Sequence, residues 1–270
     1  MRGDRGRFVK ELLTTAIEAS IDAGAEIIKI YNTGFDVTYK ADESPLTAAD
    51  TASNEAIAKY LESTGIPILS EEGKSISYEE RKGWEYMWIV DPLDGTKEFI
   101  KRNGDFTVNI ALVTNGNPLL GVIYIPVEKT LYFGSEQTGS YKVNGLARYS
   151  SMDELISQGS KLPEVNEDKI FTAVGSKSHM TPETETFFDE LKKEHGKIEI
   201  LSRGSSLKIC MVAEGAADIY PRFAPTMEWD VAAGHAIALF SGAEMVHHDT
   251  ELPLTYNKAD LLNPWFIVRR

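Results

Sequence analysis

Cysteine is almost absent from this sequence of 270 residues: Cys210 is the only one, so no disulfide can form within the chain. Histidine is scarce as well, and the adjacent pair at 247 and 248 lacks the spacing of a zinc site. No apolar run approaches the ~20 residues of a transmembrane helix. Residues 1–7 lead into an amphipathic pattern and not into a signal sequence. These features argue against a disulfide-stabilised module, a zinc enzyme and an integral membrane protein. They predict a cytoplasmic protein, with loose attachment to a membrane surface left open.

Basic residues are in the minority, with 28 Lys and Arg against 41 Asp and Glu, which gives a net charge of −13. A protein that binds polymeric nucleic acid or an anionic membrane needs a basic surface to displace counterions. The net charge therefore favours a small-molecule partner over polymeric nucleic acid or an anionic membrane. At 42% hydrophobic residues, the chain is long enough to bury a sizeable core in two packed subdomains.

Two carboxylates follow directly after an apolar run in the segment Trp88–Thr96, which reads Trp-Ile-Val-Asp-Pro-Leu-Asp-Gly-Thr. The run Tyr86–Val90 predicts a buried strand, and Pro92 should stop its ladder of hydrogen bonds, so that Asp91 and Asp94 lie on a tight turn. Turn chemistry alone is one explanation for the two acids, because Asp is common in turns. The other is a site for divalent cations, which prefer such hard oxygen ligands.

Further acids favour the metal site. Glu71 and Glu72 follow a second apolar strand-like run, and Asp230 lies in the first turn of a predicted helix. An acid at a helix start is also a common cap, so Asp230 by itself would not decide the matter. Asp50 falls on the apolar face of a helix predicted over residues 44–63. A buried carboxylate needs a hydrogen-bond donor or a nearby cation; an edge position that reaches solvent is the alternative.

Two predicted helix starts suit anions. The backbone N–H groups of Gly95 and Thr96 should open a short helix, and Gly204, Ser205 and Ser206 should open another, where N–H groups and hydroxyls can meet phosphate or ribose oxygens. Each basic residue near these starts would, taken alone, be ordinary solvated surface. Together they form a local excess of positive charge in an acidic chain: Lys97, Lys101, Arg102, Arg203, Lys208 and Arg222.

The ordered set Asp50, Glu71-Glu72, Asp91–Thr96 and Trp229–Gly234 resembles the signature of the lithium-sensitive, magnesium-dependent phosphomonoesterases that include inositol monophosphatase. Within that superfamily the chain is most similar to the bacterial 3'(2'),5'-bisphosphate nucleotidases of sulfate assimilation. The resemblance covers nearly the whole chain and is weakest between residues 150 and 169. The runs that carry it are 91–104, 204–208, 213–215, 220–223 and 262–264.

The resemblance implies an α+β fold, the layered αβαβα sandwich of the inositol monophosphatase and sugar phosphatase type. Residues 1–150 would form an N-terminal α+β half with a helix pair, an antiparallel sheet and most metal ligands. Residues 151–270 would form a C-terminal α/β half that supplies Asp230 and substrate contacts. The site would then lie in the cleft between the halves.

For the metals, the resemblance implies that Glu71, Asp91 and the main-chain carbonyl of Leu93 hold one Mg²⁺. Asp91, Asp94 and Asp230 would hold a second. Glu72 would either support a ligand or help to hold a third, weakly bound ion. Two such ions can steady the entering and the departing oxygen of an in-line displacement.

For catalysis, the resemblance implies that Thr96 and Asp50 position and help to deprotonate the attacking water, with Asp50 accepting a hydrogen bond from Thr96. Substrate-binding residues would be Leu93, Asp94, Gly95, Thr96, Gly204, Ser205, Ser206, Lys208, Arg222 and Asp230.

The implied reaction is Mg²⁺-dependent removal of the 3'-phosphate of adenosine 3',5'-bisphosphate, and of 3'-phosphoadenosine 5'-phosphosulfate as a second substrate. The first alternative keeps the metal chemistry and acts on inositol or sugar phosphates. A second alternative is a non-catalytic sensor of phosphorylated metabolites, although the complete set of acids argues against it. The resemblance also implies inhibition by Li⁺, and we favour a monomer over a homodimer.

Overall fold

The computed structural model describes residues 2–40, 45–146, 149–164, 169–176 and 180–270. The helices are α1 (Arg2–Tyr31), α2 (Ala48–Leu61), the 3-10 turn η1 (Glu62–Thr64), α3 (Tyr78–Arg81), α4 (Thr96–Ile100), α5 (Met152–Gln158), α6 (Pro182–His195), α7 (Leu207–Glu214) and α8 (Glu228–Phe240). The strands are β1 (Val37–Tyr39), β2 (Pro45–Thr47), β3 (Ile68–Ser70), β4 (Tyr86–Asp94), β5 (Thr107–Thr114), β6 (Asn117–Ile125), β7 (Thr130–Ser135), β8 (Gly139–Val143), β9 (Ser160–Lys161), β10 (Thr172–Ser176), β11 (Glu199–Arg203), β12 (Ile219–Arg222), β13 (Glu244–His247) and β14 (Phe266–Arg269).

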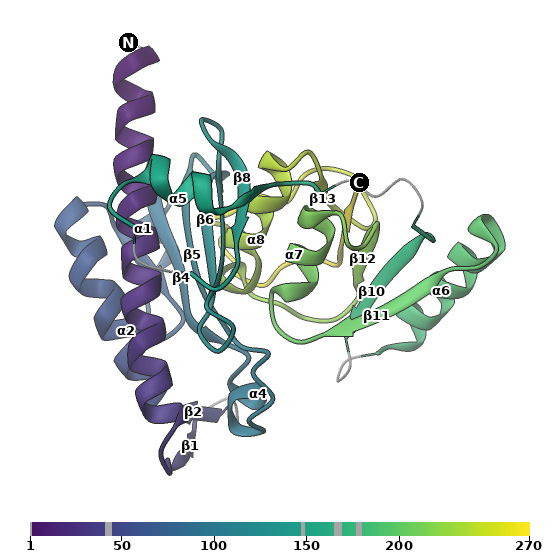
Figure 1. The fold of residues 1–270 in the computed structure, drawn as a ribbon, viewed down its shortest axis with the longest axis horizontal. Coiled ribbons are helices and arrows are strands. Elements are labelled where there is room, and N and C mark those ends of the chain that lie inside the picture. Colours follow the sequence, from purple (N-terminus) through teal and green to yellow (C-terminus); the bar gives the residue numbers. More distant parts are fainter. Residues whose placement is uncertain (1, 41–44, 147–148, 165–168, 177–179) are drawn as a thin grey trace.

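The elements form five layers. Helices α1 and α2 cover one face of a seven-stranded sheet of order β3-β4-β5-β6-β7-β8-β9 (Figure 1). Helices α7 and α8 lie between this sheet and a five-stranded sheet of order β11-β10-β12-β14-β13, whose outer face carries α6. Three clusters of buried apolar side chains fill the spaces between successive layers. The layered sandwich expected from the sequence is confirmed.

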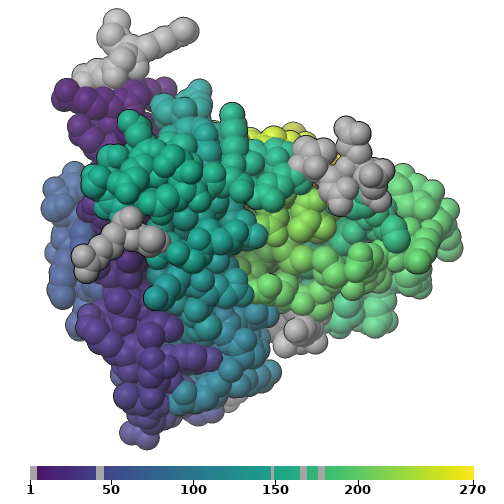
Figure 2. All heavy atoms as spheres, viewed as in Figure 1, coloured from purple at the N-terminus to yellow at the C-terminus, as the bar shows by residue number. Residues whose placement is uncertain are grey.

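The two sheets draw on different parts of the chain, since the larger runs from residue 68 to 161 and the smaller from 172 to 269. The two parts meet along a broad boundary on the molecular surface (Figure 2). The division into halves at residue 150 stays a prediction. None of the helices in the described ranges is both long and apolar enough to cross a membrane.

Most predicted elements are present, but three boundaries differ. Helix α1 begins at Arg2 and so includes most of residues 1–7, which were expected only to lead into the amphipathic pattern. Helix α2 begins at Ala48 and not at residue 44, because Pro45–Thr47 pair with β1 as a strand. Strand β4 does not end before Pro92. The register with β5 shifts between Asp91 and Asp94, so that two residues of β4 oppose one of β5 and a residue without an N–H is tolerated at this β-bulge.

Helix α8 packs unusually close to the seven-stranded sheet. A Cβ atom added at Gly121 of β6 would lie 2.3 Å from the backbone oxygen of Ala233 and 2.8 Å from the Cβ of Ala236. Only a glycine in the strand and small residues in the helix permit this approach. The contact places the first turn of α8, with Asp230, at the end of β4.

We therefore expect Gly121→Ala to destabilise the protein by about 1–3 kcal/mol, because the new methyl group must push α8 off the sheet. Urea unfolding measures the loss. Gly83→Ala is the matched control, since a Cβ at Gly83 meets no atom within 4 Å. Equal unfolding free energies for the two variants would contradict the close packing.

Candidate metal centre and substrate cleft

Three carboxylates from three elements converge on one point. Glu71 directly follows β3, Asp91 lies at the bulge of β4, and Asp230 is the third residue of α8. One oxygen from each side chain lies within 4.8 Å of the other two. Asp91 is 1% exposed, and its Oδ1 accepts a hydrogen bond from the N–H of Leu93 at 3.1 Å. The structure thus brings together three of the predicted metal ligands.

Burial and mutual repulsion raise the pKa values of two acids in this cluster, Asp91 and Asp230. Burial, followed by the charges of Glu71, Asp94 and Asp230, raises the pKa of Asp91 well above its usual range. Burial and the charge of Asp94 raise the pKa of Asp230 to about 8. Among the described residues, no Lys or Arg forms an ion pair with Asp91, Asp94 or Asp230. A divalent cation would supply the missing positive charge, so the donor set fits a hard metal ion.

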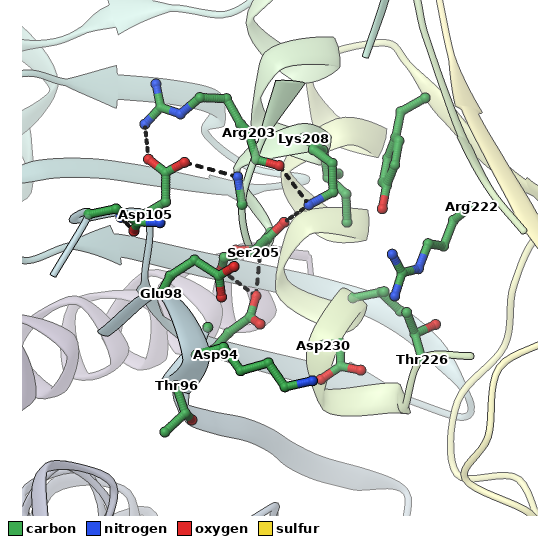
Figure 3. A pocket seen from close by; sticks show the side chains of 18 of the residues that line it. Asp94, Thr96, Glu98, Asp105, Arg203, Ser205, Lys208, Arg222, Thr226 and Asp230 are labelled. Atoms are coloured by element: carbon green, nitrogen blue, oxygen red, sulfur yellow. Dashed lines mark hydrogen bonds and ion pairs between the residues drawn. The ribbon is translucent and has the colours of Figure 1, made fainter. Parts of the chain in front are cut away.

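Asp94 lies beside the cluster and is hydrogen-bonded to the turn that precedes α7. Its Oδ2 accepts hydrogen bonds from the hydroxyl of Ser205 at 2.5 Å and from the N–H of Ser206 at 2.7 Å. The amide of Asn109 on β5 lies 3.4 Å from the same oxygen. Figure 3 shows Asp94 pointing toward Ser205 from below. Sequence reasoning missed Asn109, which faces the cluster only through the pairing of β4 with β5.

Asp50 and Thr96 are in contact, as the family resemblance implies. The hydroxyl of Thr96 donates to Asp50 Oδ1 at 3.1 Å, and Asp50 is 2% exposed. The other oxygen of Asp50 accepts from the N–H and the hydroxyl of Thr47, both at 2.7 Å, which closes a capping box at the start of α2. The spacing of Thr47 and Asp50 in the sequence carries this signal. Donors thus satisfy the buried carboxylate without a cation.

Lys40 is a second residue that the sequence did not single out. Its ammonium forms an ion pair with Glu71 Oε1 at 2.9 Å and another with Glu72. Burial raises the pKa of Glu72, and Lys40 partly offsets that rise. The side chain of Glu72 therefore meets Lys40 in this structure, and the choice between a supporting role and a third metal site stays open.

The carboxylates open into a cleft of about 560 Å³ between the two sheets. Gly95 and Thr96 line it at the start of α4, and Gly204–Ser206 line it before α7. Leu93 differs from the other predicted substrate residues, because its side chain is buried in the core and only its backbone can contribute to the site. Basic residues line the same cleft: Lys97, Lys101, Arg203, Lys208 and Arg222 (Figure 3).

Lys208 is the unusual member of this basic set, since it is only 4% exposed. Its ammonium donates to the carbonyls of Ser205 at 2.7 Å and Arg203 at 3.2 Å. Burial lowers its pKa to about 8. Arg222 is more accessible, with one guanidinium nitrogen on the carbonyl of Pro225 and its Nε without a hydrogen-bond partner. Of the two, Arg222 has more donor capacity free for an anion.

Comparison with known proteins agrees with this geometry. The family model described as "Inositol monophosphatase family" matches residues 9–265. The chain belongs to the inositol monophosphatase family. The family that the sequence signature indicated is thereby confirmed.

Several individual members of the inositol monophosphatase family are similar to this chain over almost its whole length. The chain is 42% identical over 262 residues to the 3'(2'),5'-bisphosphate nucleotidase CysQ of Shigella flexneri, an alignment that covers 95% of this chain and 99% of the relative. It is 41% identical, with the same coverage, to the CysQ of Escherichia coli K12. The crystal structure of CysQ from Bacteroides thetaiotaomicron, titled a bacterial member of the inositol monophosphatase family, matches with a TM-score of 0.89. The two chains are 54% identical, and the match covers 96% of this chain and 97% of that one.

The raised pKa of Asp230 predicts how the metal-free protein responds to pH. Its folded pKa of about 8 exceeds the unfolded value of about 4, so the folded state binds the proton more tightly. The contribution to the unfolding free energy is therefore present at low pH and is lost as the pH rises from about 4 to about 8. In excess Mg²⁺ the fall should be smaller, because the ion replaces the proton.

Urea unfolding between about pH 5 and about pH 8, with chelator and with Mg²⁺, measures this effect. Asp230→Asn is the control and should weaken the pH dependence in chelator. A metal-free protein whose stability does not change over this range, or changes equally in the Asn variant, would contradict the assignment.

Proposed function

We propose that this chain is a Mg²⁺-dependent 3'(2'),5'-bisphosphate nucleotidase that removes the 3'-phosphate of adenosine 3',5'-bisphosphate. The observation that supports this proposal most is that acidic and basic side chains line the same cleft. Glu71, Asp94 and Asp230 line that cleft together with Lys and Arg side chains from α4, α7 and the five-stranded sheet. A substrate with two separated phosphates fits such a site, since one phosphate can lie at the metal centre and the other among the basic residues. The relatives named as 3'(2'),5'-bisphosphate nucleotidases support the same substrate.

Two or three Mg²⁺ ions would be held by Glu71, Asp91, Asp94, Asp230 and the backbone carbonyl of Leu93. When bound, these ions neutralise the charge that develops on phosphate oxygens and lower the pKa of water. The backbone at Gly95 and Thr96, together with Gly204, Ser206, Lys208 and Arg222, would hold the substrate.

Thr96 and Asp50 would orient the nucleophile. The single hydroxyl proton of Thr96 goes to Asp50, so the oxygen of Thr96 is left to accept a hydrogen bond from water. A proton can then pass from water through Thr96 to the carboxylate. The water oxygen bonds to phosphorus while the bond from phosphorus to the ribose 3' oxygen breaks. The 3' oxygen takes up a proton from solvent water, Asp50 releases the proton it received to solvent, and the products are AMP and inorganic phosphate.

The proposal extends to the cellular setting. Adenosine 3',5'-bisphosphate is the substrate expected in sulfate assimilation, and 3'-phosphoadenosine 5'-phosphosulfate would be a second substrate. The protein would act in the cytoplasm as a monomer, and Li⁺ would inhibit it by taking the place of one Mg²⁺.

Phosphate release from adenosine 3',5'-bisphosphate, inositol 1-phosphate and fructose 1,6-bisphosphate tests the proposal. We expect Mg²⁺-dependent turnover that chelator abolishes, that tens of millimolar Li⁺ slows, and that favours the nucleotide in kcat/KM by about a hundredfold, or roughly 2.7 kcal/mol. Arg222→Ala should lower this preference, because it removes the guanidinium that has donor capacity free in the cleft. Comparable rates on all three substrates would keep the metal chemistry and reject the nucleotide assignment.

A further inference from the structure

The segment from Arg203 to Ser206, which joins β11 to α7, presses against Asp94. Within it Ser205 has φ 51°, in the left-handed region that residues other than glycine seldom adopt. The buried ammonium of Lys208 holds this conformation by bonding to the carbonyls of Ser205 and Arg203. The N–H of Gly204 donates to Asp105 Oδ2 at 3.0 Å. Contacts on both sides of Ser205 therefore fix its unusual backbone.

The hydroxyl of Ser205 has one proton and two neighbours. Asp94 Oδ2 lies at 2.5 Å and the hydroxyl of Thr107 at 2.8 Å. A carboxylate accepts hydrogen bonds, so the proton of Ser205 points at Asp94, and Thr107 is left to donate to Ser205, Ser206 or Asn109. Ser205 then has no proton to offer a phosphate oxygen, which needs a donor.

The same carboxylate oxygen receives a second donor, the N–H of Ser206 at 2.7 Å. These two donors, with the amide of Asn109 at 3.4 Å as a longer third, hold the plane of the Asp94 carboxylate. They leave Oδ1 without a hydrogen bond from the described residues. An oxygen in that state is the natural ligand for a cation. Partners of this kind orient metal ligands, and their loss commonly lowers metal affinity about 10- to 100-fold.

We propose that Ser205 is a positioning residue for the metal centre: its hydroxyl, presented by the left-handed turn, fixes one oxygen of Asp94 so that the other can bind a divalent cation. The inference rests on the proposed function. It replaces the substrate contact that the family resemblance implies for Ser205. It also adds the turn before α7 to the metal site, beside Asp230 of α8, before any substrate is bound.

Calorimetric titration of the full chain with Mg²⁺, without substrate, tests this role. We expect Ser205→Ala to lower the affinity for Mg²⁺ about 10- to 100-fold. Ser205→Gly should lower the affinity for Mg²⁺ by a similar factor, because it also removes the hydroxyl. Glycine adopts the left-handed backbone without strain, so the two variants together separate loss of the hydrogen bond to Asp94 from backbone strain. Ser202→Ala is the matched control. Its hydroxyl is buried three residues earlier, in β11, without a hydrogen-bond partner, and the affinity should stay unchanged.

A double-mutant cycle links the effect to Asp94. In an Asp94→Asn background, Ser205→Ala should change the affinity by less than about twofold, because the group that it positions is already altered. If both Ser205 variants bind Mg²⁺ with wild-type affinity and have a raised KM for substrate, the positioning role is overturned. Ser205 would then contact the substrate, as the family resemblance implies. A wild-type chain that binds no Mg²⁺ would overturn the proposed function together with this inference.

Discussion

Repulsion among three clustered carboxylates, one buried and two half-buried, is the constraint on which the rest of this structure depends. Glu71, Asp91 and Asp230 lie within reach of one ion, and no lysine or arginine in the described part of the chain forms an ion pair with Asp91 or Asp230. Burying ionised carboxylates together is unfavourable by several kcal/mol unless a proton or a cation neutralises them. The five layers create this arrangement: the glycine in β6 lets α8 approach the sheet, and α8 thereby brings an acid from the second half against the end of β4.

Hydrogen bonding around the cluster follows one pattern. Each central acid has one oxygen fixed by the protein: Asp91 by the N–H of Leu93, Asp230 by the N–H of Met227, and Asp94 by the turn at residues 203–206. One oxygen each of Asp91 and Asp230 also lies within 4.8 Å of the other and of one oxygen of Glu71. The protein therefore holds the geometry of the site by itself, and a bound cation would need little rearrangement of its ligands. Rigid placement of this kind is what catalysis at a metal centre requires.

The sequence indicated the candidate acids, because they lie in local patterns: apolar runs precede Glu71 and Asp91, and the Asp-Pro-Leu-Asp-Gly-Thr block is contiguous. The layered fold was predicted from the family resemblance that these blocks carry. The sequence did not predict features that depend on contacts between distant residues. Lys40 reaches Glu71 across 31 positions, and Ser205 reaches Asp94 across 111. Pro92 misled for a different reason, since the β-bulge lets the strand continue past a residue that has no N–H to donate.

Diffraction from a crystal soaked in Mn²⁺, with data collected at the manganese absorption edge, tests the central claim most directly. Mn²⁺ accepts the same oxygen ligands as Mg²⁺ and can be located by its anomalous signal. The account predicts peaks bridged by Asp91, one toward Glu71 and one toward Asp94 and Asp230. An anomalous map with no peak at these carboxylates, under conditions in which surface sites are occupied, would contradict it.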